Sequence, residues 1–262
     1  MGILLFVAFL LGLSIGSFVN AWSFRYGTLR SILSPSACRH CGRRLAWYEI
    51  IPLASFIALS GKCRTCRAPI SLQYPIVELI MGIVFLLVLY RVSDFSLLPT
   101  FYSPLFTHWI FWSILIAISV YDFRTKLIPN GGAFALAALG FLSPWLVSSG
   151  QAAFSWEHFV AGPLLALPLA AFWLFSRGRW MGLGDAKIEL GIGWFLGLSL
   201  GLFGLFAAFW LGALIGVLLI LASRFIQNAS FSLKSELPFG PFLAMAAFLV
   251  WFFGFDITIL VW

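Results

Sequence analysis

Two aspartates stand out because each lies at the edge of an apolar segment. Asp122 follows the run 118–121, and Asp185 lies in the glycine-containing run 181–187. An ionised carboxylate beside hydrocarbon costs about 3 kcal/mol, so such groups usually face a polar interior or mark a function. Two carboxylates in one poorly hydrated site share a proton. The ionised one then takes a proton from water while the protonated one polarises a carbonyl group, which is the chemistry of amide hydrolysis.

A structural role for these aspartates is an equal alternative, because nearby Arg124, Lys126 or Lys187 could pair with them at helix ends. Lys187 itself is expected to point away from Asp185, since two residues along a helix do not face each other. The remaining acidic residues are weaker candidates: we expect solvated loop or helix-end charges at Glu49, Glu189 and Glu236. Glu78 differs because it lies about one turn inside an apolar segment and needs a polar partner there.

All four cysteines fall in two CxxC pairs, Cys38–Cys41 and Cys63–Cys66, with 21 residues between them. This spacing lets four thiolates converge on one zinc ion in a closed, structural site. Neighbouring basic residues would favour the thiolate form. Two disulfides, four unrelated thiols, or His40 replacing one cysteine remain alternatives, although a cytoplasmic location disfavours disulfides.

The composition indicates which elements must position these groups. Of the 262 residues, 62% are hydrophobic and 10% charged, against about 45–50% and about 25% in ordinary soluble domains. Long continuous apolar runs, without the alternating segments of about 10 residues that form a membrane barrel, predict an all-α polytopic transmembrane bundle. The cations form local clusters, so the net charge of +7 indicates orientation in a membrane and predicts no nucleic-acid partner.

Eight spans are predicted, each close to the roughly 20 residues that cross a bilayer. The first span carries no basic n-region, which predicts a retained helix instead of a signal peptide. A turn near Gly201 to Gly204 would separate the sixth span from the seventh. The spans cover residues 1–22, 74–90, 108–121, 129–147, 158–175, 188–203, 205–223 and 238–262.

The distribution of basic residues predicts the orientation, because short cytoplasmic loops retain Lys and Arg. Half of the 16 cations lie between Arg25 and Arg67. With eight spans, every other cation except Arg91 falls on the same face as that segment. We therefore expect a multi-pass membrane protein with Asp122 and Asp185 at the cytoplasmic edge. Three regions follow: a first helix (1–22), a cytoplasmic basic segment with both CxxC pairs (23–73) and a transmembrane aspartic peptidase core (74–262).

An ordered set of motifs resembles the prepilin leader peptidases, bifunctional peptidase and N-methyltransferase enzymes of type IV pilus and type II secretion systems. Each motif alone is moderately specific, and the ordered set covers most of the chain. The motifs are Gly16–Asn20 with Arg25, both CxxC pairs, Trp47–Pro52, Tyr74–Glu78, Asp122 with Ile128–Asn130, Gly182–Lys187 and Pro238–Phe242.

The resemblance implies that Asp122 and Asp185 form the catalytic pair of a GxGD-type membrane protease. It implies a location in the bacterial inner membrane and prepilin or pseudopilin substrates, cut after a Gly between a basic leader and an apolar helix. It also implies methylation of the new N-terminus with S-adenosylmethionine, for which Glu78 is a weak candidate binding residue. Presenilin-type proteases share the Gly-Leu-Gly-Asp pattern, but the Pro-Ala-Leu motif typical of them does not occur here.

One function of another class competes with this interpretation. A non-catalytic assembly factor, or an ion- or proton-coupled transporter, would use the aspartates as carriers and the zinc-binding loop to dock a partner. Transporters often contain repeated halves with broken spans, and this chain has no convincing repeat. Membrane lipid is an expected partner in either case, and the sequence leaves the oligomeric state open.

Overall fold

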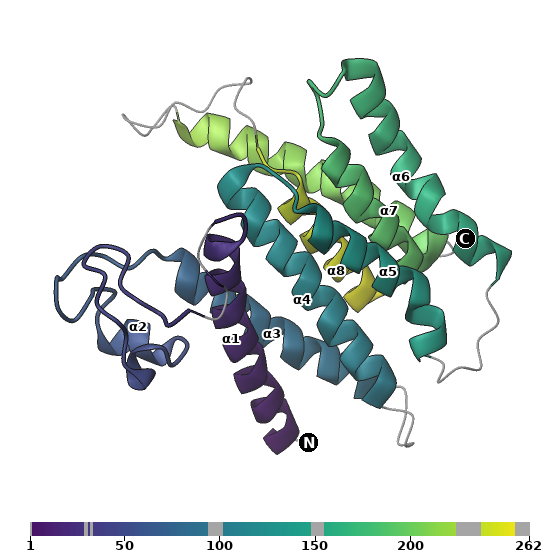
Figure 1. Ribbon diagram of the computed structural model, residues 1–262. Coiled ribbons are helices and arrows are strands. Elements are labelled where there is room, and N and C mark those ends of the chain that lie inside the picture. Colours follow the sequence, from purple (N-terminus) through teal and green to yellow (C-terminus); the bar gives the residue numbers. More distant parts are fainter. Residues whose placement is uncertain are drawn as a thin grey trace. The chain divides into compact units, whose positions relative to one another are not determined.

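The computed structural model describes residues 2–28, 31, 34–93, 102–147, 155–223 and 237–254. Within those ranges the regular structure is helical, apart from two isolated β-bridges. The chain divides into two compact units, Met1–Phe101 and Tyr102–Trp262 (Figure 1). The predicted all-α membrane class is confirmed, since six of the described helices are long and apolar enough to cross a bilayer.

The first unit is built on two long helices, α1 (Gly2–Arg25) and α3 (Gln73–Ser93). They pack closely because α1 carries Gly12 and Gly16 one turn apart. A Cβ at Gly12 would lie 2.6 Å from the Met81 carbonyl oxygen, and one at Gly16 would lie 2.7 Å from the Glu78 Cα. Small residues with this spacing let backbones approach in membrane helix pairs.

The cysteine-bearing segment connects these two helices and contains the short elements η1 (Trp47–Glu49) and α2 (Ala54–Ala58). Polar and aromatic contacts join α1 to α3 beside this segment, and one of them comes from the segment itself. The Asn20 side-chain amide donates to the Tyr74 carbonyl (3.2 Å). The Arg39 guanidinium lies 3.8 Å from the centre of the Phe24 ring, and Phe24 stacks on Tyr74.

The second unit contains α4 (Tyr102–Thr125), α5 (Asn130–Val147), α6 (Trp156–Ser176), α7 (Leu183–Ser223) and α8 (Gly240–Phe253). The first part of α7 packs against α4 through an aromatic cluster: Phe111 and Phe195 stack with ring centroids 3.7 Å apart, and the buried Trp112 contacts Phe195 edge-on. This cluster joins the helix that carries Asp122 to the helix that carries Asp185.

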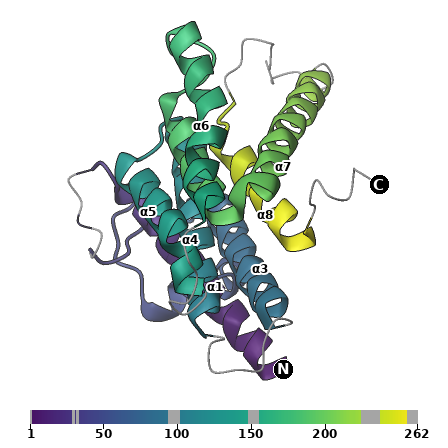
Figure 2. The same cartoon turned by 90° about the vertical axis from the view of Figure 1, so that its right-hand side faces the viewer.

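Helix α7 corresponds to two of the predicted spans, and the break between them is not where the sequence suggested. Gly197 has φ 80° and ψ 177°, whereas Gly201 and Gly204 are helical. A side chain would be strained in this conformation, and a glycine tolerates it. The light-green half of α7 diverges from α6 beyond the break (Figure 2). Eight spans is therefore an approximate count: the described residues form six long apolar helices, one of them kinked, and the shorter α8.

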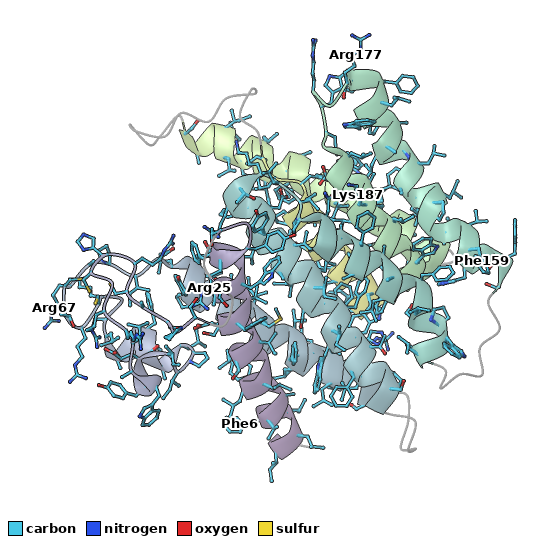
Figure 3. The ribbon with its side chains drawn as sticks, viewed as in Figure 1. Phe6, Arg25, Arg67, Phe159, Arg177 and Lys187 are labelled. Atoms are coloured by element: carbon cyan, nitrogen blue, oxygen red, sulfur yellow. The ribbon has the colours of Figure 1, made fainter. Side chains whose placement is uncertain are left out.

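The described Lys and Arg side chains of the second unit mark one end of its bundle. Arg177 ends α6 and Lys187 lies in the first turns of α7, while Phe159 lies at the other end of α6 (Figure 3). Of the remaining described cations of this unit, Arg124 lies in the last turn of α4, and Lys126 and Arg179 follow α4 and α6 at the same end. Glu236 and the predicted cytoplasmic residues Arg224 and Lys234 lie outside the described ranges, as does the end of the last predicted span, 255–262.

Candidate functional site

The structure brings Asp122 and Asp185 together within the second unit. Both side chains are buried, with 4% and 6% exposed, and the two carboxyl groups are close enough to interact electrostatically. Asp122 lies in the last turn of α4 and Asp185 in the first turn of α7. The pair thus combines two carboxyl groups in one poorly hydrated place, as proton sharing requires.

Each carboxyl group also lies at a helix N-terminus, where unpaired backbone N–H groups attract negative charge. Asp122 Oδ2 accepts a hydrogen bond from the backbone N–H of Gly240, the first residue of α8 (3.0 Å). A Cβ at Gly240 would lie 2.8 Å from that same oxygen. Asp185 lies in the first turn of α7, beside the backbone of Gly182. The two helix ends therefore stabilise one negative charge on the pair.

The loop after α4 holds the start of α7 in place. A Cβ at Gly184 would lie 2.7 Å from the Ile128 Cβ, so this position accepts only glycine at the observed spacing. The Lys187 ammonium group donates to Asn130 Oδ1 at 2.8 Å, consistent with the expectation that it points away from Asp185. The Ile-Pro-Asn and Gly-Leu-Gly-Asp motifs are thus parts of one structure.

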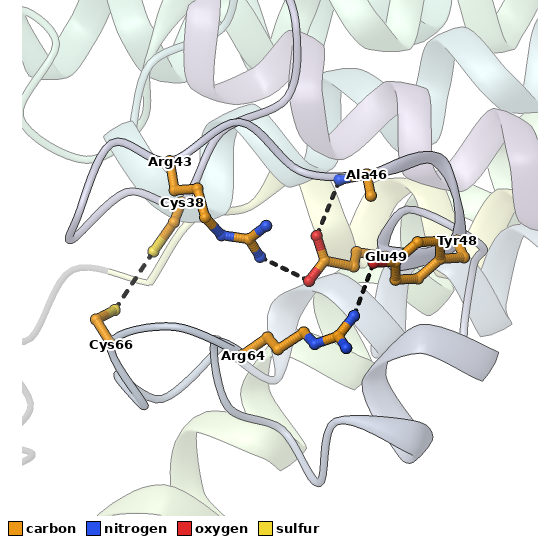
Figure 4. Close-up of polar contacts among 7 residues, drawn as sticks. All are labelled: Cys38, Arg43, Ala46, Tyr48, Glu49, Arg64 and Cys66. Carbon is orange, nitrogen blue, oxygen red and sulfur yellow. Dashed lines mark hydrogen bonds and ion pairs between the residues drawn. The ribbon is translucent and has the colours of Figure 1, made fainter.

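The four cysteine sulfurs converge in the first unit, all within 4.8 Å of one another. A tetrahedral zinc ion with Zn–S bonds of about 2.3 Å places its sulfurs about 3.8 Å apart. The Cys38 and Cys66 sulfurs are 3.8 Å apart (Figure 4). All four thiols are free of disulfides, and His40 is not part of the cluster. The donor set and its spacing therefore fit a metal ion.

The two CxxC pairs form the same local turn. In each, the residue after the second cysteine has positive φ (Gly42, 71°; Arg67, 58°) and donates its N–H to the carbonyl of the first cysteine. In each, the first cysteine N–H in turn donates to a carbonyl beyond that residue, Arg43 or Ala68. This repetition is what two halves of one metal site require.

Backbone groups of these turns favour the thiolate form. Hydrogen bonds from the Cys66 and Thr65 backbone lower the pKa of the Cys63 thiol to about 6. The Cys41 and His40 backbone lowers the pKa of Cys38 in the same way. The largest effect therefore comes from backbone N–H groups, whereas the sequence suggested the basic side chains as the cause. Thiolates are the form that binds metal.

Glu49 was expected to be a solvated charge, and this prediction is wrong. Its side chain is 1% exposed, and both carboxylate oxygens have partners: Arg43 Nη2 at 2.6 Å and the Ala46 N–H at 2.9 Å (Figure 4). The Arg43 side chain, with the Ala46 backbone, holds the pKa of the Glu49 carboxyl below its ordinary value. The ion pair connects η1 to the first cysteine turn.

Replacing Glu49 by Gln is expected to make the segment 34–72 several-fold more sensitive to protease at neutral pH. The greater protease resistance of the wild type requires the ionised Glu49 carboxylate. This resistance should therefore be lost as the pH falls through the lowered pKa of Glu49. Limited proteolysis of both proteins across that pH range measures it. Glu157→Gln, at an exposed carboxylate in the first turn of α6, is the control. A difference between Glu49→Gln and wild type that persists in acid would contradict the assignment.

Glu78 has the polar partner that its position inside a span required. It is 6% exposed, and its Oε2 accepts a hydrogen bond from the Leu53 N–H at 2.9 Å. The Ser17 side chain also bonds to it. Glu78 therefore connects α1, α3 and the loop before α2.

Glu189 was also expected to be a solvated charge, and this prediction is wrong as well. Its side chain is fully buried in α7. The sequence signal that could have identified it is spacing, since Glu189 lies four residues after Asp185, on the same face of the helix. Gly240 likewise gave no signal of its contact with Asp122, 118 residues away in the sequence.

Comparisons with known proteins agree with this geometry. Residues 10–92 match the Bacterial Peptidase A24 N-terminal domain, and residues 109–217 match the Type IV leader peptidase family. No solved structure matches the chain.

Three relatives, each called "Prepilin leader peptidase/N-methyltransferase", illustrate the similarity. The Bacillus subtilis protein is 31% identical over 96% of this chain and 95% of its own length. The Aeromonas hydrophila protein is 31% identical over 96% of this chain and 91% of its own length. The Myxococcus xanthus protein is 33% identical over 82% of this chain, which spans 63% of that relative's length. The chain therefore belongs to the type IV leader peptidase family.

Proposed function

We propose that the chain is a membrane aspartic endopeptidase that removes the basic leader of type IV prepilins or type II secretion pseudopilins and then N-methylates the product. The observation that carries the proposal is the buried, interacting pair of Asp122 and Asp185. The name shared by its relatives supports both activities. Cleavage would follow a Gly at the junction between the leader and the apolar helix of the substrate.

Hydrolysis by this pair needs one carboxylate and one carboxylic acid. The ionised aspartate takes a proton from water as the water oxygen attacks the scissile carbonyl carbon. The protonated aspartate donates a hydrogen bond to the carbonyl oxygen. When the tetrahedral intermediate collapses, the C–N bond breaks and the nitrogen takes up a proton, leaving a free carboxylate and a new N-terminal amine.

The charge distribution supports a cytoplasmic position for this site in the bacterial inner membrane. The described cations of the second unit gather at the end of the bundle that holds both aspartates, and short cytoplasmic loops are the ones that retain Lys and Arg. A basic leader in the cytoplasm and an apolar helix in the bilayer would place the scissile bond at that edge. Membrane lipid would cover the exposed apolar helix faces.

The four cysteines would hold a structural zinc ion, in a closed site that leaves no position for a reacting water. Within residues 34–72, Cys63 is the one hydrophobic side chain that is buried, so metal binding would supply much of the folding free energy of this segment. The Glu49–Arg43 pair would then orient the first cysteine turn.

The methyl group would come from S-adenosylmethionine, which supplies it to a neutral amine. Glu78 remains our candidate for binding this donor, because buried carboxylates often accept hydrogen bonds from ribose hydroxyls in nucleotide sites. Its Oε2 is engaged by the Leu53 N–H. The role of Glu78 toward the chain itself is to orient the loop before α2.

The alternative, a non-catalytic assembly factor or an ion-coupled transporter, is not favoured. The relatives that align with nearly the whole chain are named as enzymes. The proposed activity is tested by incubating the purified full chain in lipid vesicles with a prepilin and methyl-labelled S-adenosylmethionine. We expect the leader to be released and the label to appear on the shortened pilin. An intact, unlabelled prepilin would overturn the proposal.

Replacing Gly184 by Ala is expected to lower the rate of leader cleavage about ten- to hundredfold, because the added methyl group pushes Ile128 and the start of α7 apart and so displaces Asp185. Steady-state cleavage of a prepilin measures it. Gly204→Ala is the matched control, since a Cβ there meets its nearest neighbour at an ordinary 3.6 Å. Equal rates in Gly184→Ala and Gly204→Ala would refute this role of Gly184.

A further inference from the structure

Glu189 is a buried carboxyl group that the proposed mechanism does not use. Its side chain is 0% exposed, and neither carboxylate oxygen has a hydrogen-bond partner among the residues that the structure describes. Its neighbours along α7, Ile188 and Ile192, are buried and apolar. A carboxyl group is among the least favourable side chains to bury in such surroundings, and a leucine would fill the same space at no polar cost.

The position of Glu189 relates it to Asp185. Residues four apart lie one above the other on a helix face, and side chains on a helix lean toward its N-terminus. The Glu189 side chain therefore extends toward the turn of α7 that carries Asp185. Asp185 in turn interacts with Asp122 of α4.

The surrounding helices leave few charged groups that could face Glu189. The described parts of α5 and α8 contain no titratable side chain. The titratable side chains of α6 lie in its first turn, at the end of the bundle opposite the aspartate pair. On α7 itself, Lys187 binds Asn130. The titratable groups of α4 at the dyad end are Tyr121, Asp122 and Arg124, and its His108 lies toward the other end. Among these groups, Asp185 is the one that lies on its face of the helix, one turn away.

We propose that Glu189 is a positioning residue for the aspartate pair. As a neutral acid it has one O–H donor and one carbonyl acceptor. A single water between it and Asp185 would satisfy both, and buried waters typically bridge such otherwise unpaired groups. The acid O–H donates to this water, and the water donates to the Asp185 carboxylate, which orients that group and stabilises its ionised form. This inference rests on the proposed function of Asp122 and Asp185.

Two substitutions test this role in the full chain in lipid vesicles. Glu189→Gln keeps the size and offers both a donor and an acceptor, whereas Glu189→Leu keeps the size and offers neither. A hydrogen bond to a charged group accounts for about a ten- to hundredfold effect. We therefore expect kcat for prepilin cleavage to fall by that factor in Glu189→Leu, with KM unchanged and the acidic limb of the kcat–pH profile shifted. Glu189→Gln should restore both the rate and the profile.

Further measurements separate the possible outcomes. One component of the infrared C=O absorption of protonated carboxylic acids should be present in the wild type and missing from both Glu189 variants, while the component from the aspartate pair remains. Methylation of a pilin that already lacks its leader reports whether Glu189→Leu is folded. Wild-type kcat and pH profile in Glu189→Leu would overturn the inference, as would equal loss in both variants. Asp185→Asn, measured in parallel, distinguishes the two proposals. If Asp185→Asn and Glu189→Leu both cleave like the wild type, the proposed function has failed. If Asp185→Asn is inactive while Glu189→Leu cleaves like the wild type, only the role of Glu189 has failed.

Discussion

Replacing Asp122 or Asp185 by Asn is expected to abolish leader cleavage, lowering kcat/KM by about a thousandfold or more. An amide has nearly the size of the carboxyl group but cannot take a proton from water or share one with its partner. Its oxygen can still accept the Gly240 N–H that Asp122 accepts at 3.0 Å, so the start of α8 should keep its position. Cleavage of a prepilin in lipid vesicles, followed by the loss of leader mass, measures the effect.

The matched control is Glu157→Gln, the same chemical change at an exposed carboxylate in the first turn of α6, which should cleave like the wild type. Methylation of a pilin already freed of its leader shows that each aspartate variant is folded and inserted. If the Asp122 and Asp185 variants both retained cleavage, the catalytic pair would have to be sought elsewhere.

Replacing all four cysteines by Ser is expected to eliminate bound zinc, from about one ion per chain to almost none, because a serine hydroxyl does not replace a thiolate ligand at neutral pH. Structural zinc sites contribute roughly 10 kcal/mol or more of binding free energy, which is coupled to folding. The segment 34–72 should therefore become sensitive to protease. Methylation should also be lost, because Leu53 of this segment bonds Glu78. Elemental analysis and limited proteolysis of the purified full chain measure the first two effects.

Arg67→Gly provides a control within the same segment. Arg67 has a φ of 58°, a backbone conformation that glycine adopts without strain, and the equivalent position of the other cysteine turn is already Gly42. This variant loses a charge next to Cys66 but should keep its zinc. Equal zinc in the wild type and the four-Ser variant would exclude the metal site.

The helical membrane class and the two chemical motifs could be predicted because they depend on local properties. A bilayer requires about 20 apolar residues per helix whatever their neighbours are, and α1, α3 and α6 accordingly begin and end within a few residues of the predicted spans. The break in α7 was misplaced because several glycines there fit a turn equally well. Only packing against the neighbouring helices decides that Gly197, and not Gly201 or Gly204, leaves the helix.

Contacts between distant residues could not be predicted in the same way. Glutamates such as Glu49 and Glu189 usually lie at the surface as solvated charges. Only the tertiary structure shows that Glu49 is paired with Arg43 and that Glu189 is buried without a partner among the described residues. Burial depends on what the other helices place around a side chain, which a single helix sequence does not contain.

By itself, the sequence determined a polytopic helical membrane protein with two CxxC pairs and aspartates at the edges of two spans. It could do so because the length of an apolar segment and the spacing of cysteine ligands are properties of short stretches of sequence. The tertiary structure decided which groups meet: Asp122 with Asp185 and the N–H of Gly240, and Ile128 with Gly184. These partners lie on different helices, so their meeting depends on how α4, α7 and α8 pack. The chemistry proposed here depends on that packing.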